Sequence, residues 1–299
     1  MEIRELRAFI AVMEEGTFSA AARRLHISQP SLSASMQSLE RQLGGNLFVR
    51  HHTGTRPTAL GELLLPEARA LVARHDRIVA TLGAPAATTG TTLRLGVPLE
   101  LPPDLLPAAM AKVSAVHPDL TLELRHARST TQVTELKAGE LDAALVRDRP
   151  ADPDIDSVLA VEEPMGVILT TARSEELAEP SGVQLHRLAA LRWIGFARGD
   201  APNWHDQVSA TLRNSGVTGV DPAVEQDRPV PPEVKLAAAG TGQAFALAAP
   251  GWARPLPDGL VWQPLIGDPL IRRTWVIWPA DARGRELASL VDALDLAAQ

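Results

Sequence analysis

The sequence predicts an α/β protein that carries a small all-helical segment at its N-terminus. Up to Leu43, apolar residues recur at spacings of three and four, which is typical of amphipathic helices. Between Gly83 and Thr92 the chain is rich in Ala, Pro, Thr and Gly, as hinges are. Beyond Leu93, short apolar runs alternate with helical patterns. These observations predict a helical domain, a hinge and an α/β body.

The composition excludes several functional classes. The 299 residues include no cysteine, which excludes disulfides, thiolate metal sites and cysteine nucleophiles. The N-terminus shows no secretory signal and no stretch is long and apolar enough to cross a bilayer, so we expect a cytoplasmic protein. The net charge is −7, but residues 1–60 hold seven arginines against five glutamates. We therefore expect only the first segment to approach phosphate.

Three helices are predicted in the first segment. Gly16 is placed to end the first helix and Thr17 to cap the second. Ser28 can cap the third, whose first turn tolerates Pro30. That third helix is predicted to bury Leu32, Met36, Leu39 and Leu43. Its other face is small and hydrogen-bonding, so the helix can lie close against another molecule.

Two extended pieces and a long helix follow. Residues 47–50 and 56–58 are predicted to flank a turn at 53–54, as in a wing. From Thr58, a candidate N-cap, small or apolar residues follow a heptad-like spacing that predicts a dimerising linker helix. They are Leu64, Ala68, Leu71, Ile78 and Leu82.

The α/β body is predicted from short apolar runs separated by helical segments. The expected strands lie at residues 93–97, 120–124, 143–146, 167–169, 193–196, 245–247, 261–262 and 275–278. The expected helices lie at residues 104–116, before Gly139, and at 203–215, 232–239 and 284–296.

The ordered N-terminal runs resemble the winged helix-turn-helix of LysR-type transcriptional regulators. The matching runs are residues 6–9, 15–22, 25–33, 39–40, 43–44 and 47–50, with further typical segments at 139–145 and 238–242. The resemblance implies a winged helix-turn-helix at residues 1–58, a linker helix and hinge at 59–90, and a two-lobed effector domain of the type 2 periplasmic-binding-protein kind at 91–299. Lobe I would comprise about residues 91–160 and 268–299, and lobe II about 161–267.

For DNA binding, the resemblance and the polar face of the third helix point to nine residues. They are Ser28, Gln29, Pro30, Ser31, Ser33, Ala34, Gln37, Arg50 and Arg56. Plain capping or solvation remains an alternative for the serines and for Gln29, and a salt bridge to the helical core for Arg50. Ala34 departs from the family, in which a long polar side chain is frequent, so direct readout there is expected to be weaker, or limited to a thymine methyl.

For effector binding, the resemblance and the carboxyl ends of the strands point to eight residues. They are Pro98, Glu100, Arg128, Ser129, Thr130, Phe196, Arg198 and Gln243. Ser129 could equally cap a helix. Glu100 stands where the family often has a small hydroxyl residue, and it could pair with Arg128 or Arg198, or point away into solvent. Two arginines beside one carboxylate favour a small organic acid or an amphoteric metabolite as effector, with a neutral aromatic compound as the alternative.

The expected function is that of a DNA-binding transcriptional regulator controlled by a small-molecule effector. Its expected partners are double-stranded promoter DNA, the effector, a second copy of the chain, a further dimer in a tetramer and, for an activator, RNA polymerase. A solute-binding protein of the same lobed fold without a DNA role is the alternative. No catalytic constellation, cofactor loop or metal motif is present in the sequence, so we expect neither an enzyme nor a bound cofactor or metal.

Overall fold

The structure is a computed structural model that describes residues 1–51, 54–83, 91–219, 230–252 and 255–295. The chain divides into two compact units. One holds residues 1–90 with 134–141, and the other holds residues 91–133 with 142–299. Among the described residues, no helix combines the length and the apolar character that a bilayer crossing requires.

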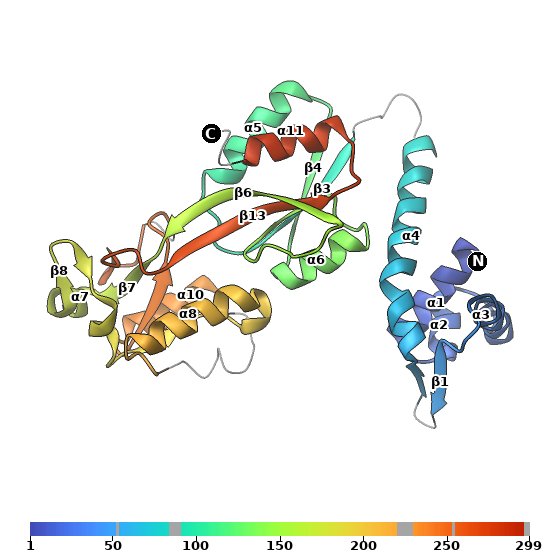
Figure 1. Ribbon diagram of the computed structural model, residues 1–299, viewed down its shortest axis with the longest axis horizontal. Helices are drawn as coiled ribbons and strands as arrows, with labels where there is room; N and C mark the ends of the chain where they lie inside the picture. The colour runs from blue at the N-terminus through green and yellow to red at the C-terminus, as the bar shows by residue number, and fades with distance from the viewer. Residues whose placement is uncertain (52–53, 84–90, 220–229, 253–254, 296–299) are drawn as a thin grey trace. The chain divides into compact units, whose positions relative to one another are not determined.

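The first unit begins with three helices, α1 (Ile3–Glu15), α2 (Phe18–Arg24) and α3 (Gln29–Leu43) (Figure 1). Gly16 ends α1 at a φ of 67°, in the left-handed region that glycine tolerates. The hydroxyl of Thr17 accepts a hydrogen bond from the Ala20 amide at 3.2 Å, and Ser28 does the same for the Ser31 amide at the start of α3. The predicted caps of α2 and α3 are therefore confirmed.

A two-stranded wing and a long helix complete this unit. Strands β1 (Phe48–His51) and β2 (Gly54–Pro57) pair antiparallel, and α4 runs over Ala59–Gly83. The Thr58 hydroxyl accepts a hydrogen bond from the Gly61 amide, as expected of a cap. Phe9 and Phe48 pack with their ring centroids 5.5 Å apart, which holds β1 against the helical core.

The second unit contains a five-stranded sheet of order β4-β3-β5-β13-β6. Its strands are β3 (Thr92–Val97), β4 (Thr121–His126), β5 (Ala143–Val146), β6 (Ile155–Pro164) and β13 (Ile271–Pro279). β3 runs parallel to β4 and β5, whereas β13 runs antiparallel to β5 and β6. Helices α5 (Leu105–Val116) and α11 (Arg285–Leu294) lie together over one face (Figure 1). Helix α6 (Ser129–Lys137) begins in this unit, and its residues from Thr134 onward are grouped with the first.

A four-stranded sheet of order β10-β11-β7-β12 forms the rest of this unit. Its strands are β10 (Arg192–Ile194), β11 (Ala244–Ala248), β7 (Gly166–Thr170) and β12 (Leu260–Pro264). The accompanying elements are α7 (Thr171–Leu177), α8 (Pro202–Asn214), α10 (Pro232–Gly240), the short pair β8 (Ala178–Glu179) and β9 (Gly182–Val183), and the 3₁₀ turns η1 (Leu185–Leu188) and η2 (Arg198–Asp200). Trp193 and Phe245 lie in its core, each at most 1% exposed.

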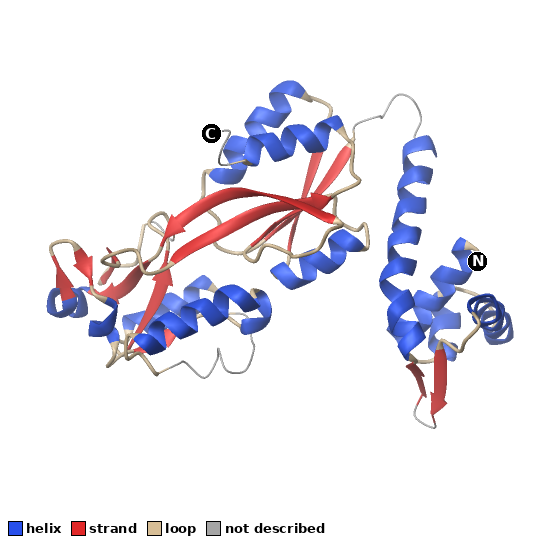
Figure 2. Ribbon diagram, in the orientation of Figure 1, coloured by secondary structure: helices blue, strands red, loops and turns tan. Residues whose placement is uncertain are grey.

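Two long strands, β6 and β13, connect the sheets and pair along their whole length (Figure 2). β6 has no counterpart among the predicted strands. Its buried and exposed residues do not alternate, and Glu162 and Glu163 stand near its end, the first exposed and the second buried. The predicted boundary between the lobes at residues 160–161 falls inside this strand, which continues to Pro164.

Candidate DNA interface and ligand cavity

Helix α3 presents a narrow polar surface to solvent. Leu32, Met36 and Leu39 point into the core and are at most 2% exposed. The residues of the opposite side are exposed or half-exposed: Gln29, Pro30, Ser31, Ser33, Ala34 and Gln37. A helix with this profile can enter the major groove and offer donors and acceptors to base edges.

The first residues of α3 are held in place by local hydrogen bonds. The Ser28 hydroxyl caps the helix, so part of its hydrogen-bonding capacity is used structurally. The Gln29 side-chain oxygen accepts a hydrogen bond from the Ser19 hydroxyl at 3.2 Å. This bond between α2 and α3 leaves the Gln29 amide nitrogen as the available donor, and it orients that donor before any DNA arrives.

Exposed arginines lie on α3 and on other elements of the same unit. Arg23 on α2, Arg41 on α3 and Arg56 on β2 are exposed, and the described residues include no acidic partner for them. Arg50 lies on β1 opposite Thr55, but its side chain is outside the described part of the structure. The wing is tied to the helices by the Thr55 amide, which donates to the Gly16 carbonyl at 2.9 Å.

Ion pairs fasten α4 to α1. Glu14 accepts from Arg69 of α4 at 2.8 Å and from Arg24 of α2 at 2.7 Å. Partial burial by itself raises the pKa of Glu14, but these two guanidinium groups outweigh burial and lower it. Arg7 also pairs with Asp76, further along α4.

The predicted heptad stripe of α4 is only partly free. Ala68 is fully buried and Leu64 packs against the helical core, so these two residues hold α4 to its own domain. Leu71 and Ile78 are 42% and 52% exposed. Leu82 lies outside the described side chains. The stripe available to a second chain therefore begins at Leu71, later than predicted.

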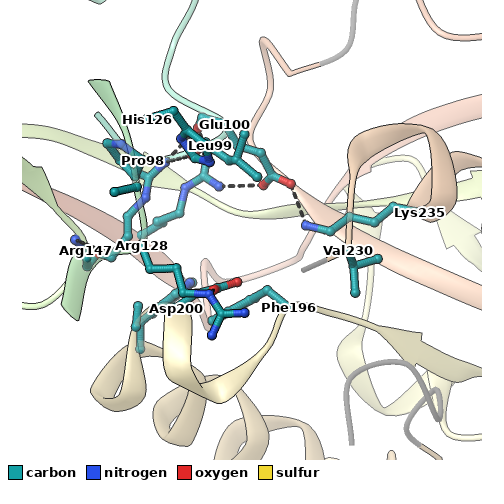
Figure 3. A pocket seen from close by; sticks show the side chains of 15 residues that line it. Pro98, Leu99, Glu100, His126, Arg128, Arg147, Phe196, Asp200, Val230 and Lys235 are labelled. Carbon is teal, nitrogen blue, oxygen red and sulfur yellow. Dashed lines mark hydrogen bonds and ion pairs between the residues drawn. The ribbon is translucent and has the colours of Figure 1, made fainter. Parts of the chain in front are cut away.

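A cavity of about 120 Å³ lies in the second unit (Figure 3). Its charged lining residues are Glu100, Arg128, Arg147, Asp200, Lys235 and Arg272. Its apolar lining residues include Pro98, Leu99, Phe196, Trp204 and Val230. A concave apolar surface with a few convergent polar groups is the usual form of a small-molecule site.

Glu100 points into the protein, where Figure 3 shows it meeting Lys235. Its carboxylate accepts from Lys235 Nζ at 2.5 Å and from Arg272 at 3.0 Å. Burial alone raises the pKa of Glu100, but the neighbouring cations outweigh burial and lower it. The predicted pairing with Arg128 or Arg198 is wrong, and so is the alternative of a carboxylate turned to solvent. Glu100 has a φ of 61°, and this left-handed backbone accompanies the inward course of its side chain.

Arg147 follows β5 and connects the same cluster to the sheet. Its guanidinium donates to the carbonyl oxygens of Leu99 and Glu100, both at 2.8 Å, and to the Thr274 hydroxyl. Its backbone amide donates to the Ser129 hydroxyl at 3.1 Å. Burial, with repulsion from Arg272, lowers the pKa of Arg147 to about 9.

Contacts between the two sheets' loops close the cavity on another side. Arg128 pairs with Asp200 at 2.9 Å, and the Thr130 hydroxyl donates to the Gly199 carbonyl at 2.9 Å. Asp148 accepts hydrogen bonds from the first amides of α8, those of Asn203 and Trp204. Burial raises the pKa of Asp148.

Comparison with known proteins decides the family. The family model described as the bacterial regulatory helix-turn-helix protein, lysR family, matches residues 3–62, and the LysR substrate binding domain matches residues 86–298. The chain belongs to the LysR-type transcriptional regulators. It is thus a DNA-binding regulator with an effector-binding domain, and the alternative of a solute-binding protein without a DNA role is set aside.

Relatives of this LysR-type regulator are similar along most of its length. The HTH-type transcriptional regulator ClcR of Pseudomonas putida is 34% identical over 247 residues, 81% of each chain. The crystal structure of the LysR family regulator CbnR superposes with a TM-score of 0.71 at 25% identity and covers both chains fully. A second structure, of full-length CbnR with its target DNA, gives a TM-score of 0.67 at 26% identity and covers 98% of this chain and 99% of that one.

The structure distributes the predicted effector residues of this regulator between the cavity and its surroundings. Pro98, Glu100, Arg128, Ser129 and Phe196 line the cavity. The described lining does not include three others: Thr130, Arg198 and Gln243. Arg198 is instead 62% exposed and pairs with Asp206 at 2.7 Å.

The predicted effector set lacks the three buried cations of the lining, Arg147, Lys235 and Arg272, as well as several of its apolar residues. Arg147 follows directly after a predicted strand, and that position was a signal for it. Lys235 lies in a helix and Arg272 within a strand, where a single charged residue usually faces solvent. No local pattern in the sequence distinguishes these two.

Proposed function

We propose that α3 and the wing of this LysR-type regulator bind promoter DNA through the predicted residues, some of which would contact bases and others phosphates. Gln29, Ser31, Ser33 and Gln37 would face base edges, Ala34 and Pro30 would allow close approach, and Arg50 and Arg56 would contact phosphate. The exposed small polar face of α3 is the observation that supports this assignment. Because its target would be promoter DNA, we propose a cytoplasmic location.

Gel-shift titration separates base reading from phosphate contact. Gln29→Ala should lose about 1 to 3 kcal/mol on the cognate site and little on random DNA. Arg56→Ala should weaken binding to both DNAs and lower the salt slope by about 1. Arg4→Ala is the control, since Arg4 is an exposed arginine that already pairs with Glu2 at 2.6 Å. Equal losses on both DNAs for Gln29→Ala would contradict base reading.

We further propose that two chains pair through the exposed part of α4. Leu71 and Ile78 are one heptad apart and would otherwise remain in water. Pairing would present two α3 helices to an inverted-repeat site, and tetramers would form from such dimers. RNA polymerase would be a further partner wherever the bound protein activates transcription.

Sedimentation tests the pairing. Leu71→Asp should release monomers at micromolar concentration because a carboxylate would have to be buried at the interface. Glu62→Gln, on the opposite side of α4, should leave the assembly unchanged. A dimer that persisted in Leu71→Asp would place the interface elsewhere.

The effector of this regulator is proposed to bind in the cavity, as a small organic acid or amphoteric metabolite. The cations that line the cavity support this proposal. Effector binding would alter the packing of the two sheets' loops and, through the assembly, the spacing of the DNA-binding domains.

A further inference from the structure

A buried cluster at the cavity, four of whose five charged side chains line it, holds unequal numbers of positive and negative groups. Arg147, Lys235 and Arg272 meet Glu100 and Glu163, and each of these side chains is at most 10% exposed. Among the described residues of this cluster there are therefore three cations and two carboxylates. A buried charge without compensation is expensive in free energy, so the surplus calls for a negative partner.

Both carboxylates already have cationic partners. Glu100 contacts Lys235 with one oxygen and Arg272 with the other. One oxygen of Glu163 lies 3.1 Å from Arg272 and 3.7 Å from Arg147, so it serves two guanidinium groups at once. The lowered pKa of Arg147 agrees with this shortage of negative charge, because repulsion from Arg272 contributes to it after burial.

The remaining charged pair of the lining adds no net charge. Arg128 and Asp200 pair with each other at 2.9 Å. Lys235, Arg147 and Arg272 all reach the cavity, so an anion inside it can contact the surplus directly. Lys235 also lies 5.8 Å from the Trp252 ring centroid, which provides a π-face but no negative charge.

The size and the walls of the cavity limit the body of such an anion. Phe196, Trp204 and Val230 supply apolar surface to the wall of the cavity. The volume of about 120 Å³ is of the order of the roughly 150 Å³ cavity that holds benzene in another protein. A ring or a short unsaturated chain fits this space.

We propose that Glu100 sets the charge of the ligand, so that the cavity selects a small apolar monoanion over the matched dianion. This inference rests on the proposed role of the cavity as the effector site. One negative charge brings the described cluster to neutrality. A second would find Lys235 and Arg272 already paired with Glu100 and would meet the Glu100 carboxylate as a like charge.

Substitutions that change the cluster by one charge should shift the preference in opposite directions. Glu100→Gln raises the surplus to two and should favour dianions. Lys235→Met removes the surplus and should abolish the preference for an anion over the neutral amide. Lys235→Met also keeps both carboxylates paired with arginines, so it should fold even if Glu100→Gln does not.

Calorimetry on the full-length protein provides the test, with benzoate, isophthalate and benzamide as probes, and with crotonate, fumarate and crotonamide as a smaller set. We expect wild type to bind each monocarboxylate about tenfold or more tightly than its dicarboxylate, Glu100→Gln to reverse that order, and Lys235→Met to lose the advantage of benzoate over benzamide. Arg273→Met is the matched control, because Arg273 neighbours Arg272 in the chain but pairs with Glu162 on the surface.

The possible failures are distinct. If wild type takes isophthalate as readily as benzoate and Lys235→Met weakens both, the cavity is the ligand site and the role given to Glu100 is wrong. If no acid of either set binds, or if binding is the same in Lys235→Met and Arg273→Met, the cavity is not an anion site. Either of these last two results also overturns the proposed effector site. The DNA-binding proposal is tested separately, by gel shift.

Discussion

Helix α3 keeps its polar side chains in solvent and buries only apolar ones, whereas the cluster at the cavity buries five charged side chains together. The first region is stabilised by caps and apolar packing within a short stretch of chain. The second depends on ion pairs between residues as far apart as Glu100 and Arg272, which are 172 positions apart. Substitutions in the charged cluster should therefore cost several times more free energy of unfolding than substitutions on α3.

The largest effect is expected at Glu163, and its neighbour supplies the control. Glu163 is 9% exposed and pairs with Arg272, whereas Glu162 is 39% exposed and pairs with Arg273. Glu163→Gln should lower the free energy of unfolding by about 3 to 5 kcal/mol, because it leaves buried cations short of a carboxylate. Glu162→Gln should cost no more than about 1 kcal/mol. Denaturant unfolding of both variants measures this, and equal costs would show that the cluster is solvated.

A smaller effect is expected at the start of α3. Ser28→Ala removes the side-chain acceptor of the Ser31 amide and should cost about 1 kcal/mol. Ser33→Ala also removes a serine hydroxyl from this region, but inside the helix where no cap is lost, and should change stability by less than about 0.5 kcal/mol. Hydrogen exchange of the α3 amides in the full-length protein reports both. Identical exchange in the two variants would mean that the cap does not stabilise α3.

The smallest effect on stability is expected at Arg198, on the surface. Its guanidinium, together with His205, lowers the pKa of Asp206 to about 2. Because this folded-state pKa is depressed, the pair stabilises the fold above the ordinary value of 3.8 and loses that contribution as the pH falls through about 2. Arg198→Ala should raise the pKa of Asp206 towards 3.8 and barely change the melting temperature, since both groups are exposed. NMR titration of the Asp206 carboxyl carbon in wild type and in Arg198→Ala measures this pKa. An unchanged pKa would show that the ion pair does not persist in solution.

The same contrast explains what could be predicted from the sequence. Helix starts and ends depend on residues within a few positions, so they can be predicted from a single stretch of sequence. Gly16, Thr17, Ser28 and Pro30 are examples. The apolar period of α3 likewise indicates which side is buried, and the structure confirms it for Leu32, Met36 and Leu39. The prediction is wrong for Leu43, which is 36% exposed at the last position of the helix.

The charged cluster could not be predicted because its members are brought together only by the fold. A glutamate in a loop, a lysine in a helix and an arginine in a strand each have solvent as their ordinary surroundings. The direction of the Glu100 side chain depends on partners in two distant elements, α10 and β13. Leu64 and Ala68 show the same limit, because heptad spacing does not distinguish a stripe that meets a second chain from one that packs on its own domain.

The pairing of Arg272 with Glu163 has a consequence for allostery, because these two residues stand directly opposite each other on β13 and β6. These are the strands through which the two sheets are joined, and the ladder shifts register only a short way along, between Thr274 and Trp275. An anion that contacted Arg272 would compete for the guanidinium that bridges the two strands. The same side chains would then bind the anion and hold together the two strands that join the sheets. Anion binding could therefore be coupled to the arrangement of the sheets without a chain of intervening residues.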